Sequence, residues 1–220
     1  MNAAIWVTCK LALVTTLVLF VIGTPLAWWL AQGRGRYLRT LAEAVVALPL
    51  ILPPTVLGFY LLLLLAPGGA IGQFSQSGLA FSFIGLVIGS VIYSLPFVVQ
   101  PLAASFAQLD TRLLQLGRSQ GLNTGQLLRH IVLPATSHAF VMAGALGFAH
   151  TVGEFGVVLM IGGNIPGETQ VLSILLFDEV ETLNFAAAHR IAGGLLAASF
   201  ILLVALYGWQ RHRRHTRVAA

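Results

Sequence analysis

Charged side chains are scarce in this sequence: they make up 9% of its 220 residues, against 57% for hydrophobic residues. A soluble domain usually has about a quarter charged residues. The apolar excess therefore excludes a single soluble core and favours a polytopic membrane protein. A net charge of +5 would suggest nucleic acid as a partner of a soluble protein. Here the basic residues lie in short segments between apolar runs, which is typical of membrane topology, so we expect no nucleic-acid partner.

Motifs for chemistry are missing as well. Cys9 is the single cysteine, so no intrachain disulfide can form. The sequence has no GxxxxGKS/T phosphate loop, which means that ATP is not bound by this chain. It also has no GxSxG, HExxH or paired-cysteine motif. We therefore predict no catalytic residue, no metal site and no cofactor here, and the chain is expected not to be an enzyme.

Five apolar stretches are long enough to cross a membrane. About 20 residues span the hydrocarbon core as a helix, and segments in lipid must be helical because their backbone groups find no other partner. The expected fold is an all-α, polytopic bundle of transmembrane helices, forming a single domain over residues 1–210. The expected spans are approximately 5–31, 41–66, 79–106, 135–161 and 191–209.

The positions of arginine orient these spans. Arginines follow the first, third and fifth spans, whereas residues 67–78 and 162–189 contain neither Lys nor Arg. Short basic loops stay on the cytoplasmic side. The pattern predicts a membrane protein with its N-terminus outside the cell membrane and its C-terminus in the cytoplasm. Residues 211–220 are expected to form a basic cytoplasmic tail that meets anionic membrane lipid.

Prolines gather in the second expected span, where Pro49, Pro53 and Pro54 occur within six residues. A proline inside a helix removes a backbone hydrogen bond and bends the chain. Such a bend is either a passive packing kink or part of a hinge or pathway, as in transporters with broken helices. Pro53 and Pro54 are therefore candidate pathway residues.

Glu154 is the one acidic residue deep in the fourth expected span. A carboxyl group within a membrane is costly and suggests a function. His150 precedes it by one helical turn and is placed to pair with it. The open readings are a structural pair, a gate or pathway residue, and an enzyme site built on both residues.

A turn-rich segment, GGNIPG, follows the fourth expected span. It is either a simple external turn, or a gate or docking surface for an external binding protein. Gly163, Asn164 and Pro166 are its candidate gate residues. Acidic residues further along, up to Glu181, are suited to a basic rim on such a partner.

Residues 108–134 form the longest polar segment between two spans. Its leucines suit a short amphipathic helix, with a break expected near Gly121 or Gly125. Such a helix either packs on its own bundle or docks in a groove of a partner.

The spacing in this loop resembles the cytoplasmic coupling loop of bacterial ABC import permeases, the so-called EAA loop. The residues that carry the resemblance are Gly121, Ile131, Leu133 and Pro134, with Leu122 beside them. Where that family has Glu-Ala-Ala, this chain has Gln115, Leu116 and Gly117. Residues 47–64 and 147–170 are similar to molybdate permease subunits.

The resemblance implies a type I ABC importer permease that works as a homodimer. Two separate ATPase subunits would bind ATP and dock on residues 115–134, where a charged side chain in place of Gly121 is expected to disrupt docking. A periplasmic molybdate-binding protein would deliver the cargo. Tungstate or sulfate remains an alternative cargo, and a membrane enzyme using His150 and Glu154 remains an alternative class.

Overall fold

The computed structural model describes residues 1–75 and 77–218, and only the backbone of Thr111, Thr124 and residues 211–218. The rest of the predicted basic tail, residues 219–220 and the side chains from 211 onwards, lies outside the described part. Every regular element in the described part is helical. In chain order the elements are α1 (Asn2–Gln32), α2 (Arg36–Ile51), α3 (Pro54–Leu65), η1 (Gly72–Phe74), α4 (Phe83–Ala107), α5 (Thr111–Ser119), α6 (Thr124–Leu127), the π-helical turn η2 (Leu128–Val132), α7 (Leu133–Val152), α8 (Gly156–Gly162), α9 (Leu172–Glu181) and α10 (Phe185–Val218).

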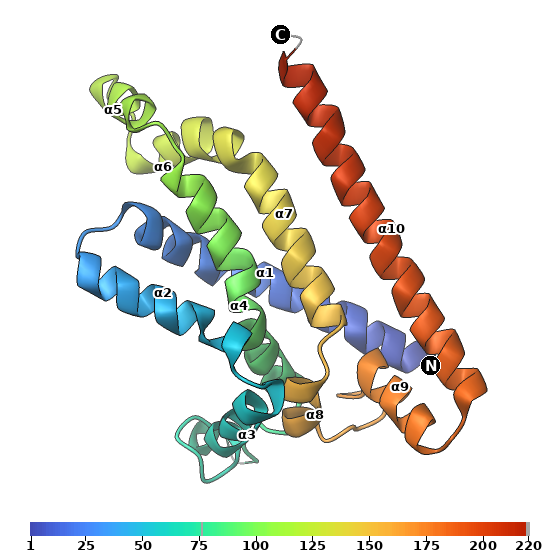
Figure 1. The fold of residues 1–220 in the computed structure, drawn as a ribbon. Helices are drawn as coiled ribbons and strands as arrows, with labels where there is room; N and C mark the ends of the chain where they lie inside the picture. The colour runs from blue at the N-terminus through green and yellow to red at the C-terminus, as the bar shows by residue number, and fades with distance from the viewer. Residues whose placement is uncertain (76, 219–220) are drawn as a thin grey trace.

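Three long helices, α1, α4 and α7, form the centre of the molecule (Figure 1). Their contact is close because small residues face bulky ones. A methyl group on Gly147 would lie 2.7 Å from Val98, and one on Gly144 would lie 2.7 Å from Phe20. Buried apolar side chains such as Phe106 fill the rest of this core. Dispersion and close packing, rather than the hydrophobic effect, hold such helices together in lipid.

The second expected span is two helices instead of one. α2 and α3 meet at an angle of 112° across a short break. The cause is the pair Pro53–Pro54, since neither residue can donate a helical hydrogen bond and each forces the residue before it into an extended conformation. Leu52 and Pro53 accordingly have ψ angles of 136° and 133°. The expected proline break is confirmed, and it divides the expected span over residues 41–66 into two helices, which count as one span only if the bent pair is taken together.

The fourth expected span also needs correction. α7 ends at Val152 rather than Ile161, and α8 starts as a separate helix at Gly156. In a continuing helix the Glu154 carbonyl would accept a hydrogen bond from four residues further on. Instead it accepts one from the Ser173 hydroxyl at the start of α9. The carbonyl freed by the break is therefore satisfied by a tertiary contact, which the sequence pattern does not reveal.

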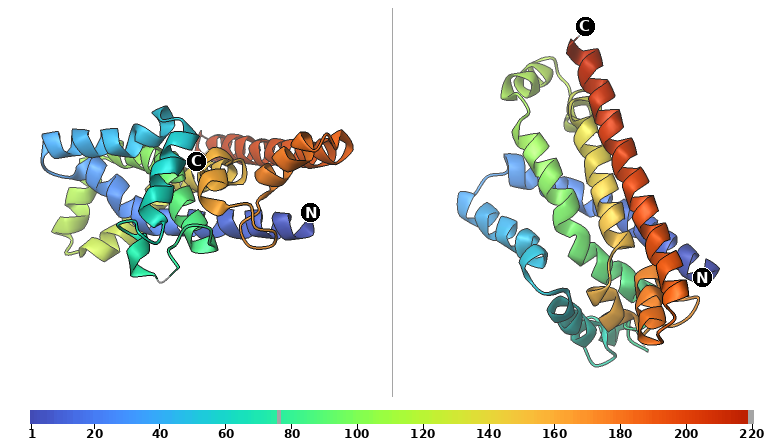
Figure 2. Two further views of the ribbon diagram at one scale, coloured as in Figure 1. Left: turned by 90° about the horizontal axis from the view of Figure 1, so that it is seen from below. Right: turned by 45° about the vertical axis from the view of Figure 1, so that its right-hand side comes forward.

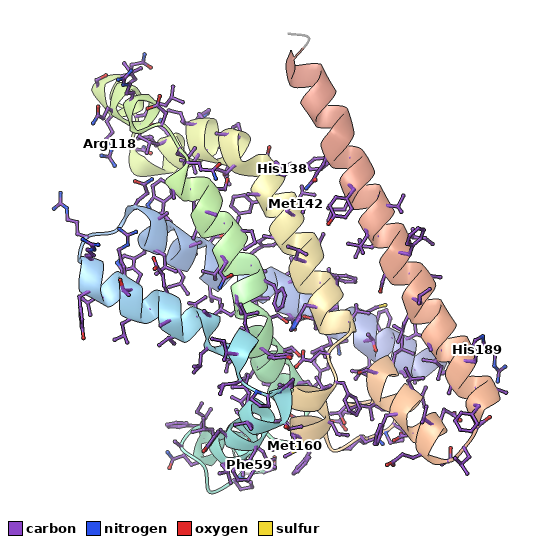
Figure 3. The ribbon with its side chains drawn as sticks, in the orientation of Figure 1. Phe59, Arg118, His138, Met142, Met160 and His189 are labelled. Carbon is purple, nitrogen blue, oxygen red and sulfur yellow. The ribbon has the colours of Figure 1, made fainter. Side chains whose placement is uncertain are left out.

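Within the described residues, four helices are long and apolar enough to cross a membrane, or five if the bent pair α2–α3 counts as one span. The expected number of about five agrees with the higher count. α10 lies at the edge of the bundle and touches α9 and α7 (Figures 1 and 2). Its contacts with α7 include a hydrogen bond from Gln210 to the Met142 sulfur and stacking of Trp209 on His138 (Figure 3).

Candidate functional site

The two helix breaks lie side by side and line an open cavity of about 470 Å³. We call it the break cavity. Its walls come from the start of α3, the end of α7, the start of α8 and one residue of α4. The residues that line it include Pro54, Thr55, Tyr93, His150, Glu154 and Gly156. The fold thus brings together Pro54 and Glu154, two pathway candidates that are 100 positions apart in sequence.

Close packing of α8 on α3 holds the two breaks together. A methyl group on Gly156 would lie 2.6 Å from the Cβ of Pro54, and one on Gly58 would lie 2.8 Å from the Cβ of Met160. Figure 3 shows Met160 of α8 beside the region of α3 that carries Phe59. These glycines are needed because any side chain there would push the helices apart.

His150 is not paired with Glu154, so that expectation is wrong. Its Nδ1 lies 2.9 Å from the Ser94 hydroxyl, and its ring stacks on Phe97 with centroids 3.9 Å apart. Ser94 also lies 3.1 Å from the Thr151 hydroxyl. The imidazole is therefore held by α4, away from the acid, because α7 ends between the two residues and the helical spacing no longer applies.

Glu154 is 3% exposed, and neither carboxyl oxygen has a hydrogen-bond partner among the described residues. The Ser90 hydroxyl faces it without forming a hydrogen bond of normal geometry. Ser90 and Ser94 lie one turn apart on the same face of α4. Sequence reasoning missed both, although two hydroxyls at this spacing in an apolar helix are a usable signal for a polar face.

The candidate gate residues Gly163, Asn164 and Pro166 do not line the break cavity. They belong to a tightly bonded turn between α8 and α9. The Asn164 amide donates to Asp178 at 2.8 Å and accepts from Gln170 at 3.0 Å. The turn therefore has an evident structural role, and Asp178 is already engaged rather than free for a basic partner.

The polar loop over residues 108–134 folds into α5, α6 and η2 at the opposite end of the molecule from α3 and α8 (Figure 1). The expected break falls at Gly121, whose φ is +80°. Gly121 N–H donates to the Arg118 carbonyl and Leu122 N–H to the Gly117 carbonyl. This is a Schellman cap, which favours glycine at the left-handed position. Asn123 and Gln126 then start α6 with a reciprocal capping box.

The candidate docking residues divide into two groups. Gly117 is buried, and Leu122 and Ile131 pack over it, with the Ile131 Cδ1 2.8 Å from where a Cβ would lie. This group holds the loop together. Gln115, Leu116, Gly121, Leu133 and Pro134 form the exposed group.

One of the leucines expected on the amphipathic helix, Leu113, was not among the candidate docking residues. Leu113 lies one turn before Leu116 on α5, and the two side chains are 49% and 58% exposed. Figure 3 shows Arg118 at the far end of the same helix. We call the pair Leu113 and Leu116 the docking face. The three-residue spacing on an amphipathic helix was the signal available for it.

A family model described as binding-protein-dependent transport system inner membrane component matches residues 23–213. The chain belongs to this family. The permease is 51% identical over 215 residues to the molybdenum transport system permease protein ModB of Azotobacter vinelandii, covering 96% of this chain and 95% of that protein. It is 33% identical over 207 residues to the sulfate transport system permease protein CysT of Salmonella typhimurium, covering 93% of this chain and 74% of that protein.

Solved structures agree on the fold of the permease. A chain of the MetNI methionine ABC transporter in an inward-facing conformation matches with a TM-score of 0.71 at 18% identity, covering 95% of this chain and 94% of that one. A chain of a bacterial ABC transporter that imports alginate matches with a TM-score of 0.72 at 16% identity, covering 97% of this chain and 79% of that one. The expected ABC importer permease fold is confirmed. Because the family is one of transport subunits, the alternative of a membrane enzyme using His150 and Glu154 is wrong.

Proposed function

We propose that the permease is the membrane subunit of an ATP-driven importer that carries molybdate from a periplasmic binding protein into the cytoplasm. The observation that carries this proposal is 51% identity to a molybdenum permease over nearly the full length of both chains. Identity to the sulfate permease is 33%. Molybdate is therefore favoured over sulfate, while tungstate is a tetrahedral oxyanion of the same charge and remains a competitor to test.

We further propose that the permease acts as a homodimer in the inner membrane. Each copy would bind one of two ATPase subunits through residues 108–134, which we call the docking loop. ATP is bound by those subunits, and this chain needs no cofactor of its own. The orientation has the N-terminus in the periplasm and the tail at 211–220 in the cytoplasm, near lipid headgroups. In support, the N-terminus lies at the end of the molecule that carries α3, α8 and α9, and α10 ends toward α5 (Figures 1 and 2).

The structure suggests how docking would reach the transport route. From Gly125 to Val152 the chain is continuously helical through α6, η2 and α7, with a bend before α7 (Figure 1), and we call this segment the rod. One end of the rod packs with the docking loop, and the other ends at the break beside Glu154. A helix transmits displacement along its axis with little compression, because every turn is hydrogen-bonded. Closure of the ATPases would therefore move the α7 end of the break cavity.

Uptake of labelled molybdate in cells with and without this permease tests the cargo. We expect uptake to disappear in the deletion strain and to return with the gene. Excess sulfate should leave uptake unchanged in wild-type cells, whereas tungstate should compete. Unchanged uptake in a deletion strain that has no second importer would overturn the cargo, and competition by sulfate alone would move it to sulfate.

Substitutions at Gly121 separate loop strain from partner contact. Alanine there must adopt a left-handed conformation, which costs about 1 kcal/mol, whereas asparagine tolerates it better. A Cβ at this position meets nothing within 4 Å in the free chain. We expect ATPase binding, measured by co-purification and titration, to weaken in the order Asn, Ala, Arg. Equal binding by the Ala and Arg variants would contradict contact between the ATPase and this position.

A further inference from the structure

The break cavity has the features of a binding site rather than of a packing defect. Its volume of about 470 Å³ falls within the range of about 300–1,000 Å³ that small-molecule sites occupy. Apolar walls dominate, and Thr55, Tyr93, His150 and Glu154 add polar groups to them. Neither Lys nor Arg is among the described residues that line it. A ligand of this cavity would therefore meet neutral donors and acceptors rather than a fixed cation.

Glu154 determines what kind of ligand fits. Its carboxyl group is buried, and neither oxygen forms a hydrogen bond in the described structure; the Ser90 hydroxyl that faces it is unpaired as well. An ionised carboxylate in that position would cost several kcal/mol. The titratable neighbours in the cavity are Tyr93 and His150, and the Nδ1 of the imidazole is occupied by Ser94. The inexpensive form of Glu154 is consequently the neutral acid, whose O–H is a hydrogen-bond donor without an acceptor.

We propose that the break cavity is an oxyanion subsite on the transport route, in which Glu154 as a neutral carboxylic acid donates a hydrogen bond to an oxygen of the passing anion. This inference rests on the proposed function, since it assumes that an oxyanion is the cargo. The start of α3, at Pro54 and Thr55, also faces the cavity and adds the positive end of a 12-residue helix. Neutral donors bind an anion without the strong attraction of a buried arginine, which suits a conduit that must release its cargo.

A metal cation is a poorer fit to the same cavity. Within the described part of the chain no group of three His, Cys, Asp or Glu residues is placed to hold a metal ion. Glu154 would be the single acidic ligand, and hard cations need about six oxygen ligands. A hydrogen-bond acceptor is therefore the better partner for the neutral acid of Glu154. A tetrahedral oxyanion has four oxygen atoms that can accept this hydrogen bond.

Chemical modification tests the proposal on the wild-type protein. A hydrophobic carbodiimide adds the O–H of a protonated carboxyl group across its C=N bond, and the adduct rearranges to a stable N-acylurea. We expect mass spectrometry of the purified permease–ATPase complex to find this adduct on Glu154. Millimolar molybdate should suppress it at least fivefold, whereas chloride at equal ionic strength should not. The exposed Glu43 provides the internal reference, because its labelling should not respond to molybdate.

Two variants at the same position test transport. Glu154→Gln keeps the length and an N–H donor, and Glu154→Met keeps the length without a donor. We expect molybdate uptake by the Glu154→Gln variant to stay within about threefold of wild type. Uptake by the Glu154→Met variant should fall about tenfold, which is the effect of one lost hydrogen bond. Dimer assembly and co-purification of the ATPase subunits should be retained in both variants, which separates a loss of anion binding from a loss of folding.

Two outcomes would count against the subsite. Wild-type uptake by the Met variant overturns it, and so does labelling of Glu154 that molybdate does not affect. If the Met variant fails to assemble, the labelling experiment decides alone, because it uses the intact protein. Absence of molybdate uptake in the wild type would instead overturn the proposed cargo, so the two failures are distinguishable.

Discussion

Replacing Leu113 and Leu116 together with glutamate is expected to abolish binding of the ATPase subunits. The two side chains project from α5 and are about half exposed. Burying a fully exposed leucine contributes about 1.5–3 kcal/mol, and docking can add only about half of that for each of these side chains, so loss of the pair alone would weaken binding about tenfold to a hundredfold. Two carboxylates in an apolar groove add a desolvation penalty on top of that. Co-purification of the ATPase with the tagged permease, followed by transport assays, measures the effect.

The matched control for this pair is replacement by methionine, which keeps volume and apolar character and should bind normally. The glutamate variant should still insert and purify as a stable permease, because neither leucine belongs to the buried core. If the ATPases bind it with wild-type affinity, the docking face is misplaced, and Leu133 and Pro134 become the next candidates.

Replacing Gly156 with alanine is expected to impair transport even though the change adds one carbon. The new Cβ would lie 2.6 Å from the Pro54 Cβ and 3.4 Å from backbone atoms at the start of α3. Neither neighbour is the flexible end of a side chain, so α8 and α3 must separate. Overpacking of this kind costs roughly 1–3 kcal/mol. We expect a lower melting temperature in detergent and a loss of molybdate uptake of tenfold or more.

Gly68→Ala is the control for that substitution. Gly68 lies in an exposed turn, has an ordinary φ, and a Cβ there meets nothing within 4 Å. The control should match wild type in stability and uptake. Normal uptake by Gly156→Ala would mean that the two helix breaks need not stay in close contact, and the break cavity would lose its support as part of the route.

In the docking loop, the sequence predicted the backbone break but not which side chains are buried. Local chemistry specified its break, because Gly121 occupies the left-handed position of a cap that few other residues tolerate. Local chemistry did not specify the direction in which each side chain of the loop points. Gly117, Leu122 and Ile131 pack inward, whereas Leu113 points outward. That division depends on how α5 folds back on η2, a contact between segments that periodicity alone does not place.

Glu154 and Pro54 illustrate the same limit in the membrane. Each was a candidate by itself, since an intramembrane carboxyl group and a double proline are both costly in a helix. Their meeting in one cavity follows from glycines at 58 and 156 that let α3 and α8 touch. The expected partnership of Glu154 with His150 failed because α7 ends at Val152, between them, and Ser94 holds the imidazole.

The sequence by itself determined that the chain crosses a membrane, that it binds no ATP through a phosphate loop, and where its proline break and glycine cap fall. These depend on hydrophobicity, charge and backbone sterics, which act within a few residues. Only the tertiary structure decided that two helices break side by side, that Glu154 is left without a partner, and that Leu113 is exposed. Such outcomes depend on contacts between residues far apart in the chain, and neither composition nor spacing encodes them locally.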